Sequence, residues 1–182
     1  MTNKIIGIQG DKLDKINISS DTSIFLAHEA QKLGYKIFYY TPSNLSIIKN
    51  KTYANGVFVK FNYERKKFYK IYKKQKIDVE NLKFILIRQD PPFNSEYLIT
   101  TLILDDLKKV KVINNPTAIR NVSEKLYSKH FIKFMPNTLF SNNIEEIKKF
   151  YKQNKSMIMK PINGYGGNQI HLIKNKFNKK LI

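Results

Sequence analysis

The residues LKFILI at positions 82–87 form an apolar run that a single lysine interrupts. A strand of this composition needs cover on both faces, which is the environment of a parallel sheet flanked by helices. Strand-like residues at 5–9 and 36–40 enclose a helical segment at 22–33, in the alternating order that such a fold requires. The sequence therefore predicts an α/β fold with a Rossmann-like, mainly parallel sheet, in which 82–87 is the central strand.

The ends of the predicted helices carry recognisable signals. Ser20 or Asp21 can cap the helix over 22–33, and Gly34 can end it. The segments that follow the central strand are a helix from Asn94 or Ser95 to 107, a short strand at 110–114 and a helix opened by Pro116. We expect the first domain to comprise residues 1–122.

Two segments between the second strand and 82–87 are harder to assign. Residues 46–61 alternate in the manner of a hairpin, with a turn at Asn50-Lys51 or at Asn55-Gly56, and Asn-Gly is the stronger turn signal. In the basic segment 63–76, Phe68, Ile71 and Tyr72 recur at helical spacing. This spacing predicts a helix with an apolar stripe toward the core and a lysine face toward solvent.

The net charge of +19 raises nucleic acid as a partner. All but three of the 33 basic residues are lysines, however, whereas base-reading and bidentate phosphate contacts favour arginine. We interpret the charge as a solvated lysine surface and expect no specific nucleic acid partner. The chain has no cysteine, no apolar stretch long enough to span a membrane and no signal-peptide pattern, so we expect a cytoplasmic protein without membrane contact.

Arg88 and Asp90 follow the run 82–87 directly, in the segment RQDPPF. Ligands of open α/β sheets gather at the carboxyl ends of the strands, so these two side chains are candidates for substrate binding. Two prolines force the segment toward extended geometry. An Arg88–Asp90 pair that merely fixes the loop is the structural alternative.

Residues 123–182 differ in character from the first domain. A helix at 141–151 places Ile144, Ile147 and Phe150 on one face, and two alternating runs at 157–162 and 169–173 form a hairpin. The connection between these runs contains three of the seven glycines of the chain, at positions 164, 166 and 167. Backbone N–H groups of such a loop can approach phosphates closely, although the loop lacks the Walker A pattern.

The order of these segments resembles that of the prokaryotic-type glutathione synthetases, members of the ATP-grasp superfamily, along essentially the whole chain. The segments that carry the resemblance are SSDTSIFLAHEAQKLGY (19–35), LIRQDPPFNSEYLITTLIL (86–104), VINNPTAIRNVSEKLYSKHF (112–131), MPNTL (135–139) and IMKPINGYGGNQI (158–170). The resemblance implies that residues 123–182 begin an α+β ATP-grasp domain that is incomplete here. The sequence departs from the family pattern at two places. Ser123 stands where an asparagine is frequent, and the segment INNP (113–116) lacks the lysine that commonly precedes the proline.

The resemblance also implies a reaction. Such enzymes use ATP to phosphorylate the carboxylate of γ-glutamylcysteine, and the glycine amine then attacks the acyl phosphate to give glutathione, ADP and phosphate. The cofactors are ATP and Mg²⁺ or Mn²⁺, and the enzyme can be a homo-oligomer. The chemistry requires cations and positioned substrates rather than a nucleophilic side chain, so a chain without cysteine is sufficient for it.

Site residues follow by matching motif positions. The resemblance implies that Lys125 and Lys160 reach the α- and β-phosphates of ATP. It also implies that the loop with Asn163, Gly164, Gly166, Gly167 and Asn168 closes over the nucleotide. Ser20, Arg88 and Asp90 are candidates for binding the dipeptide, and we identify no catalytic side chain.

The metal ligands of the family lie well downstream of the glycine loop, beyond residue 182. We therefore expect this chain to be a fragment of a glutathione synthetase that is inactive alone. One alternative is an inactive remnant or a subunit of a split ATP-grasp ligase, and a less favoured one is a basic nucleic-acid-binding protein.

Overall fold

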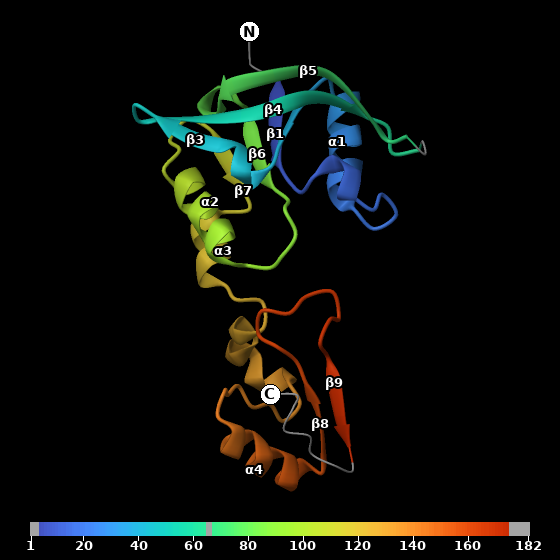
Figure 1. The fold of residues 1–182 in the computed structure, drawn as a ribbon, viewed down its shortest axis with the longest axis vertical. Coiled ribbons are helices and arrows are strands. Elements are labelled where there is room, and N and C mark those ends of the chain that lie inside the picture. Colours follow the sequence, from blue (N-terminus) through green and yellow to red (C-terminus); the bar gives the residue numbers. More distant parts are fainter. Residues whose placement is uncertain (1–3, 65–66, 175–182) are drawn as a thin grey trace. The chain divides into compact units, whose positions relative to one another are not determined.

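The computed structural model describes residues 4–64 and 67–174, and the termini and residues 65–66 lie outside this description. The chain divides into two compact units, Met1–Asn121 and Val122–Ile182 (Figure 1). Each unit has its own secondary structure and is described by itself.

The first unit is a seven-stranded mixed sheet with helices (Figure 1). Its strands are β1 (Ile5–Gln9), β2 (Lys36–Tyr40), β3 (Leu45–Ile48), β4 (Lys51–Phe61), β5 (Tyr69–Asp78), β6 (Phe84–Ile87) and β7 (Lys111–Ile113). Its helices are α1 (Thr22–Lys32), α2 (Ser95–Asp105) and α3 (Pro116–Asn121), with short 3₁₀ turns η1 (Leu13–Lys15), η2 (Pro42–Asn44) and η3 (Val79–Asn81). The predicted α/β fold class is confirmed.

The strands fall into a parallel and an antiparallel set. β1 pairs in parallel with β2 and β6, and β6 pairs in parallel with β7. β4 pairs antiparallel with β2, β3 and β5. The run 82–87 therefore contains an interior strand of the parallel set, as predicted, but the centre of the whole sheet lies nearer β1 and β2. The reason is that the antiparallel strands extend the sheet only on the β2 side.

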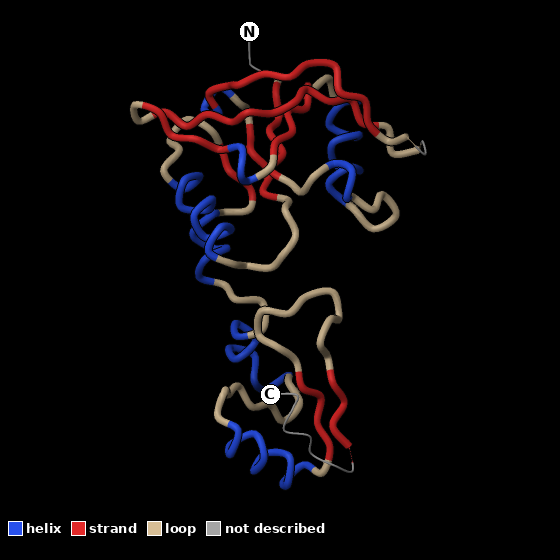
Figure 2. Tube along the Cα trace, in the orientation of Figure 1, coloured by secondary structure: helices blue, strands red, loops and turns tan. Residues whose placement is uncertain are grey.

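Two apolar clusters lie on opposite faces of this sheet, because successive strand residues point in opposite directions. One cluster joins Ile6, Ile8 and Ile37 to Ile24 and Ala27 of α1. The other cluster comprises Phe38, Tyr40, Ala54, Phe58, Val79, Leu82, Ile85, Ile87, Leu104 and Val110, against which Tyr97 of α2 and Ile119 of α3 pack. Figure 2 shows the helices of the first unit beside its strands.

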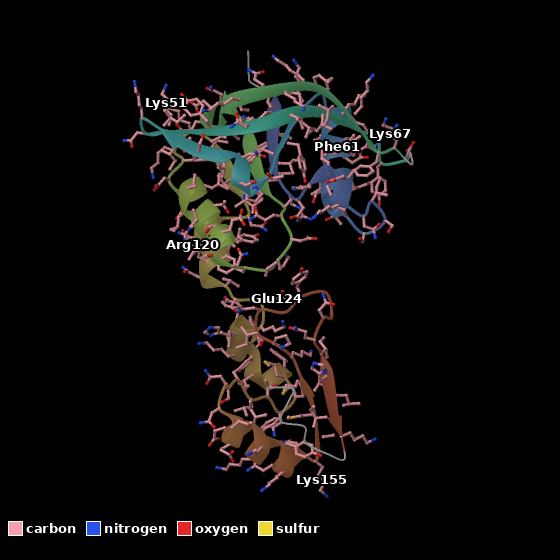
Figure 3. The ribbon with its side chains drawn as sticks, viewed as in Figure 1. Lys51, Phe61, Lys67, Arg120, Glu124 and Lys155 are labelled. Carbon is pink, nitrogen blue, oxygen red and sulfur yellow. The ribbon has the colours of Figure 1, made fainter. Side chains whose placement is uncertain are left out.

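The helix caps agree with the sequence signals. The Asp21 carboxylate accepts hydrogen bonds from the backbone N–H groups of Ser23 (2.6 Å) and Ile24 (3.0 Å), so Asp21 rather than Ser20 caps α1. Asn94 caps α2 by accepting from the Tyr97 N–H at 3.0 Å. Arg120 of α3, labelled in Figure 3, forms an ion pair with Asp105 at the end of α2, which ties the two helices together.

The predicted Asn55-Gly56 turn is wrong. The turn between β3 and β4 is formed by Lys49 and Asn50, both at positive φ (48° and 59°), one residue before the weaker alternative. Gly56 lies inside β4, which begins at Lys51 and ends at Phe61 (Figure 3). A Cβ atom on Gly56 would lie 2.5 Å from Cζ of Phe38 and 2.6 Å from the Tyr39 carbonyl oxygen. This glycine therefore serves close packing of two strands and not chain reversal.

The predicted helix over 63–76 is also wrong. Its described residues from Tyr69 onward belong to β5, which pairs with β4 from Phe61 to Tyr53, while residues 65–66 lie outside the description. Pairing along a neighbouring strand outweighs a short apolar spacing, since three residues define a helical stripe only weakly. The lysines of β5, at positions 70, 73, 74 and 76, are all exposed.

The second unit has α+β secondary structure (Figure 1). It contains the 3₁₀ segment η4 (Leu126–Phe134), helix α4 (Ile144–Asn154) and an antiparallel pair of β8 (Ser156–Met159) and β9 (His171–Lys174). Asn143 caps α4, and Ile147 is buried on one face of this helix, as its sequence predicts. No helix within the described part of the chain is both long and apolar enough to cross a bilayer.

Candidate functional site

In the first unit, Arg88 connects the end of β6 to the start of α1. Its Nε donates to Ser23 Oγ at 2.9 Å, and its Nη2 donates to Thr22 Oγ1 at 2.7 Å. The Arg88 backbone N–H extends the β1–β6 pairing by donating to the Gln9 carbonyl at 2.7 Å. The guanidinium is thus held at the carboxyl end of the parallel strands, where ligands of such sheets bind.

Asp90 lies among carboxylates at the same end of the sheet. Its backbone N–H donates to Asp11 Oδ2 at 2.8 Å. Burial raises the pKa of Asp90, the negative charges of Asp11 and Asp21 raise it further, and Arg88 partly opposes them. Among the described residues no hydrogen bond or ion pair joins Arg88 to Asp90. The structural alternative, in which these two side chains pair to fix the loop, is therefore wrong, because Arg88 contacts Thr22 and Ser23 instead.

The third predicted residue, Ser20, is exposed in the loop before α1. Its hydroxyl donates to the Asn17 carbonyl at 3.3 Å. The loop also holds Ser19, whose hydroxyl donates to Asn17 Oδ1 at 2.7 Å. Ser20 is therefore close in sequence to the helix start that Arg88 contacts, but its recorded partner is in its own loop.

Sequence reasoning missed three residues of this cluster. Gln9 is the last residue of β1, and Gln89 lies in the segment after β6. Both are buried, and their side-chain amides are hydrogen bonded to each other. Asp11 accepts from Asp90 through its side chain and from the Tyr39 hydroxyl (2.6 Å) through its carbonyl. The rule that selected Arg88, proximity to the carboxyl end of a strand, also selects Gln9 and Asp11 if it is applied to β1.

In the second unit, a loop connects β8 to β9 (Figure 2), and the sequence places Gly164, Gly166 and Gly167 in it. Gly166 and Gly167 have φ values of 59° and 77°, which side-chain-bearing residues rarely adopt. Two hydrogen bonds turn the backbone, from Gly164 N–H to the Pro161 carbonyl (3.2 Å) and from Asn168 N–H to the Tyr165 carbonyl (3.0 Å). Most of this loop is exposed, including Asn163, Gly166, Gly167 and Asn168.

The two predicted lysines differ in their surroundings. Lys125 directly precedes η4, and its ammonium donates to the carbonyl oxygens of Pro161 (2.7 Å), Ile162 (3.3 Å) and Gly164 in the glycine loop. Lys160 is exposed and follows β8 directly. The structure thus places the Lys125 ammonium against the backbone of the glycine loop, and Lys160 directly precedes that loop in the chain.

Such a loop is suited to bind phosphate. The exposed Gly166 and Gly167 lack side chains that would keep a ligand from the backbone, Lys125 contacts the loop, and the exposed Lys160 directly precedes it. In contrast, the described residues contain no group of three or more histidine, aspartate or glutamate side chains that could hold a metal ion.

Comparison with known families agrees with both units. The N-terminal domain model of the prokaryotic glutathione synthetases matches residues 5–120, and the ATP-grasp domain model of the same family matches residues 124–181. The two matches therefore divide the chain into the N-terminal domain and part of the ATP-grasp domain of one family. The chain belongs to the prokaryotic glutathione synthetase family.

Individual relatives show the same likeness. The chain is 36% identical to the glutathione synthetase of Mesorhizobium japonicum over 163 residues, which covers 89% of the chain and 52% of that protein. It is 35% identical to the synthetase of Buchnera aphidicola from Acyrthosiphon pisum over 171 residues, 93% of the chain and 53% of that protein. The chain spans about half the length of the curated relatives it matches.

Among solved structures, D-alanyl-alanine synthetase A of Vibrio cholerae is similar over 96% of this chain and 54% of its own, with a TM-score of 0.48 and 16% identity.

Proposed function

We propose that this chain provides the dipeptide-binding domain and the phosphate-binding loop of a glutathione synthetase. The reaction is the ATP-dependent joining of γ-glutamylcysteine and glycine through an acyl phosphate. The observation that carries the proposal is the glycine loop with Lys125 and Lys160 beside it, in a chain that matches both domain models of one ligase family.

For ATP, the proposal assigns the phosphates to the loop of Asn163, Gly164, Gly166, Gly167 and Asn168, with positive charge from Lys125 and Lys160. The N–H groups of the exposed Gly166 and Gly167 and the exposed Lys160 ammonium can stabilise phosphoryl oxygens by hydrogen bonds and charge. Mg²⁺ or Mn²⁺ would further neutralise the phosphoryl charge when bound. None of the residues assigned here is proposed as a ligand of that metal ion.

For γ-glutamylcysteine, the proposal assigns the cluster at the carboxyl ends of β1 and β6. This substrate carries an ammonium group and carboxylates. The Arg88 guanidinium and the nearby Asp11, Asp21 and Asp90 carboxylates offer charges of both signs within one site. Ser20, which precedes Asp21 in the sequence, adds an exposed hydroxyl to the proposal. Cytoplasmic location and homo-oligomer formation stay predictions.

The test is glutathione formation by the chain joined to the remaining half of a relative. Residues 1–182 are fused to the part of the M. japonicum synthetase that lies beyond the matched region. We expect ATP-, metal- and glycine-dependent glutathione formation by the fusion, and none by the 182-residue chain alone. A folded fusion that binds no ATP and forms no glutathione would contradict the proposal, whereas turnover by the purified chain alone would contradict the expected need for the second half.

Binding of nucleic acid provides a separate test of the lysine surface. Because the positive charge is carried by dispersed, exposed lysines, we expect any binding to be weak, indifferent to sequence and lost by a few hundred millimolar salt. Fluorescence anisotropy with two labelled DNA duplexes of different sequence, titrated at increasing NaCl, measures this. Salt-resistant or sequence-selective binding would overturn our interpretation of the charge.

A further inference from the structure

The ammonium of Lys125 is fully engaged with the glycine loop. An ammonium has three N–H donors, and three carbonyl oxygens lie around this one, those of Pro161 (2.7 Å), Gly164 and Ile162 (3.3 Å). These acceptors are 36 to 39 residues further along the chain. A single side chain therefore connects the start of η4 to three successive points of the loop.

These contacts are a major restraint on the first half of the loop. Three carbonyl dipoles that converge on one point repel one another unless a cation lies between them, and hydrogen bonds to a charged group are stronger than neutral ones. The loop backbone otherwise has the two turn hydrogen bonds of Gly164 and Asn168, and most of its residues are exposed. Removing the Lys125 charge should therefore loosen the loop locally.

We propose that Lys125 is a positioning residue, which shapes the glycine loop (residues 161–168) through backbone carbonyls before a nucleotide arrives. A phosphate that binds this ammonium must displace at least one carbonyl, and the longest contact, to Ile162, is the first to be replaced. Loop order and phosphate binding are then coupled through one side chain. The phosphate step rests on the proposed function, whereas the positioning of the ligand-free loop does not.

The first experiment measures hydrogen–deuterium exchange of the full chain without ligand. We expect Lys125→Met to speed exchange of the two hydrogen-bonded loop amides, those of Gly164 and Asn168, by about tenfold or more, as loss of charge-assisted hydrogen bonds implies. Exchange in α4 should be unchanged. Lys125→Arg should restore part of the protection, because its planar fork keeps the charge but not the three-donor geometry. Lys129→Met, an exposed lysine of η4, is the matched control and should exchange like the wild type.

The second experiment observes the side-chain ammonium by ¹⁵N NMR in the unmodified chain. A hydrogen-bonded Lys125 ammonium should give a signal protected from solvent exchange, identified by its loss in both Lys125→Met and Lys125→Arg. Added tripolyphosphate should move this signal and leave that of Lys129 in place.

The outcomes separate the two claims. Wild-type exchange of the loop in a folded Lys125→Met variant would overturn the positioning role. If that variant does not fold, absence of a protected Lys125 signal in the wild type would overturn it instead. A protected signal that tripolyphosphate leaves unmoved would retain the positioning role and refute the phosphate step, and with it the assignment of Lys125 to ATP.

Discussion

Replacing Lys160 by methionine in the fused enzyme is expected to lower kcat/KM for ATP by about 10²- to 10³-fold, the loss typical of a removed charge-stabilising group. Lys160 is exposed at the start of the glycine loop, and methionine keeps much of the packing of its stem while removing the cation. Folding should therefore be little affected. Steady-state kinetics with varied ATP, together with thermal unfolding, measures both quantities.

Lys174 offers a matched control for this substitution. It is an exposed lysine of the same hairpin, paired with Ser156 at the opposite end from Lys160. Lys174→Met should therefore leave the ATP kinetics within about twofold of the parent, since an isolated surface charge contributes little. Equal losses in the two variants would show that general hairpin charge, and not Lys160, assists catalysis.

Gly166→Val should impair the same enzyme by another route. The glycine has a φ of 59°, a region that is strongly unfavourable for a β-branched residue, so the substitution distorts the loop rather than removing charge. Its Cβ would meet only the Asn168 amide, at 3.9 Å, so backbone strain is the expected cause and not a steric clash. We expect weaker ATP binding, which isothermal titration measures, and normal kinetics would argue against closure of the loop over the nucleotide.

Gly56→Ala should be among the most destabilising single-methyl changes in the first unit. The added Cβ would lie 2.5 Å from the Phe38 ring and 2.6 Å from the Tyr39 carbonyl, and the backbone atom cannot rotate away. Overpacking of this kind lowers the free energy of unfolding by about 3 kcal/mol. Chemical denaturation of the variant, followed by circular dichroism, measures the loss.

The neighbouring residue controls for the position in the strand. Asn55 is exposed in the same strand, so Asn55→Ala should change the free energy of unfolding by about 0.5 kcal/mol or less. This pair of variants also tests the reassignment of the Asn55-Gly56 dipeptide. If it formed a turn, Gly56→Ala would be mild and Asn55→Ala would disturb the chain reversal.

The fold was predictable where local chemistry and tertiary pairing agree. The caps at Asp21 and Asn94 and the apolar strand before Arg88 are short-range signals that the sheet only reinforces. Gly56 and the segment of β5 show the opposite case. In both, pairing with a strand distant in sequence decides the conformation, and a turn dipeptide or a helical spacing carries no information about that partner.

The candidate sites were predictable in their location but not in their contacts. Arg88 and Asp90 could be placed at a strand end, yet the choice of Thr22 and Ser23 as partners of Arg88 depends on how α1 meets the sheet. Likewise, motif position selects Lys125, but nothing local to it indicates three carbonyl partners almost forty residues away. The surrounding fold determines such contacts, so sequence patterns reveal the residue types and not their geometry.

The exposed lysines of β5 bear on how copies of this chain behave toward one another. Among the described strands β5 pairs with β4 alone, so one side presents unpaired N–H and C=O groups to solvent. Lys70, Lys73, Lys74 and Lys76 crowd that border with like charge, and a second copy approaching to extend the ladder is repelled. This barrier to aggregation is electrostatic and weakens as added salt screens the ammonium groups. We therefore expect the four lysines of β5 to hinder strand-to-strand association between copies of this chain.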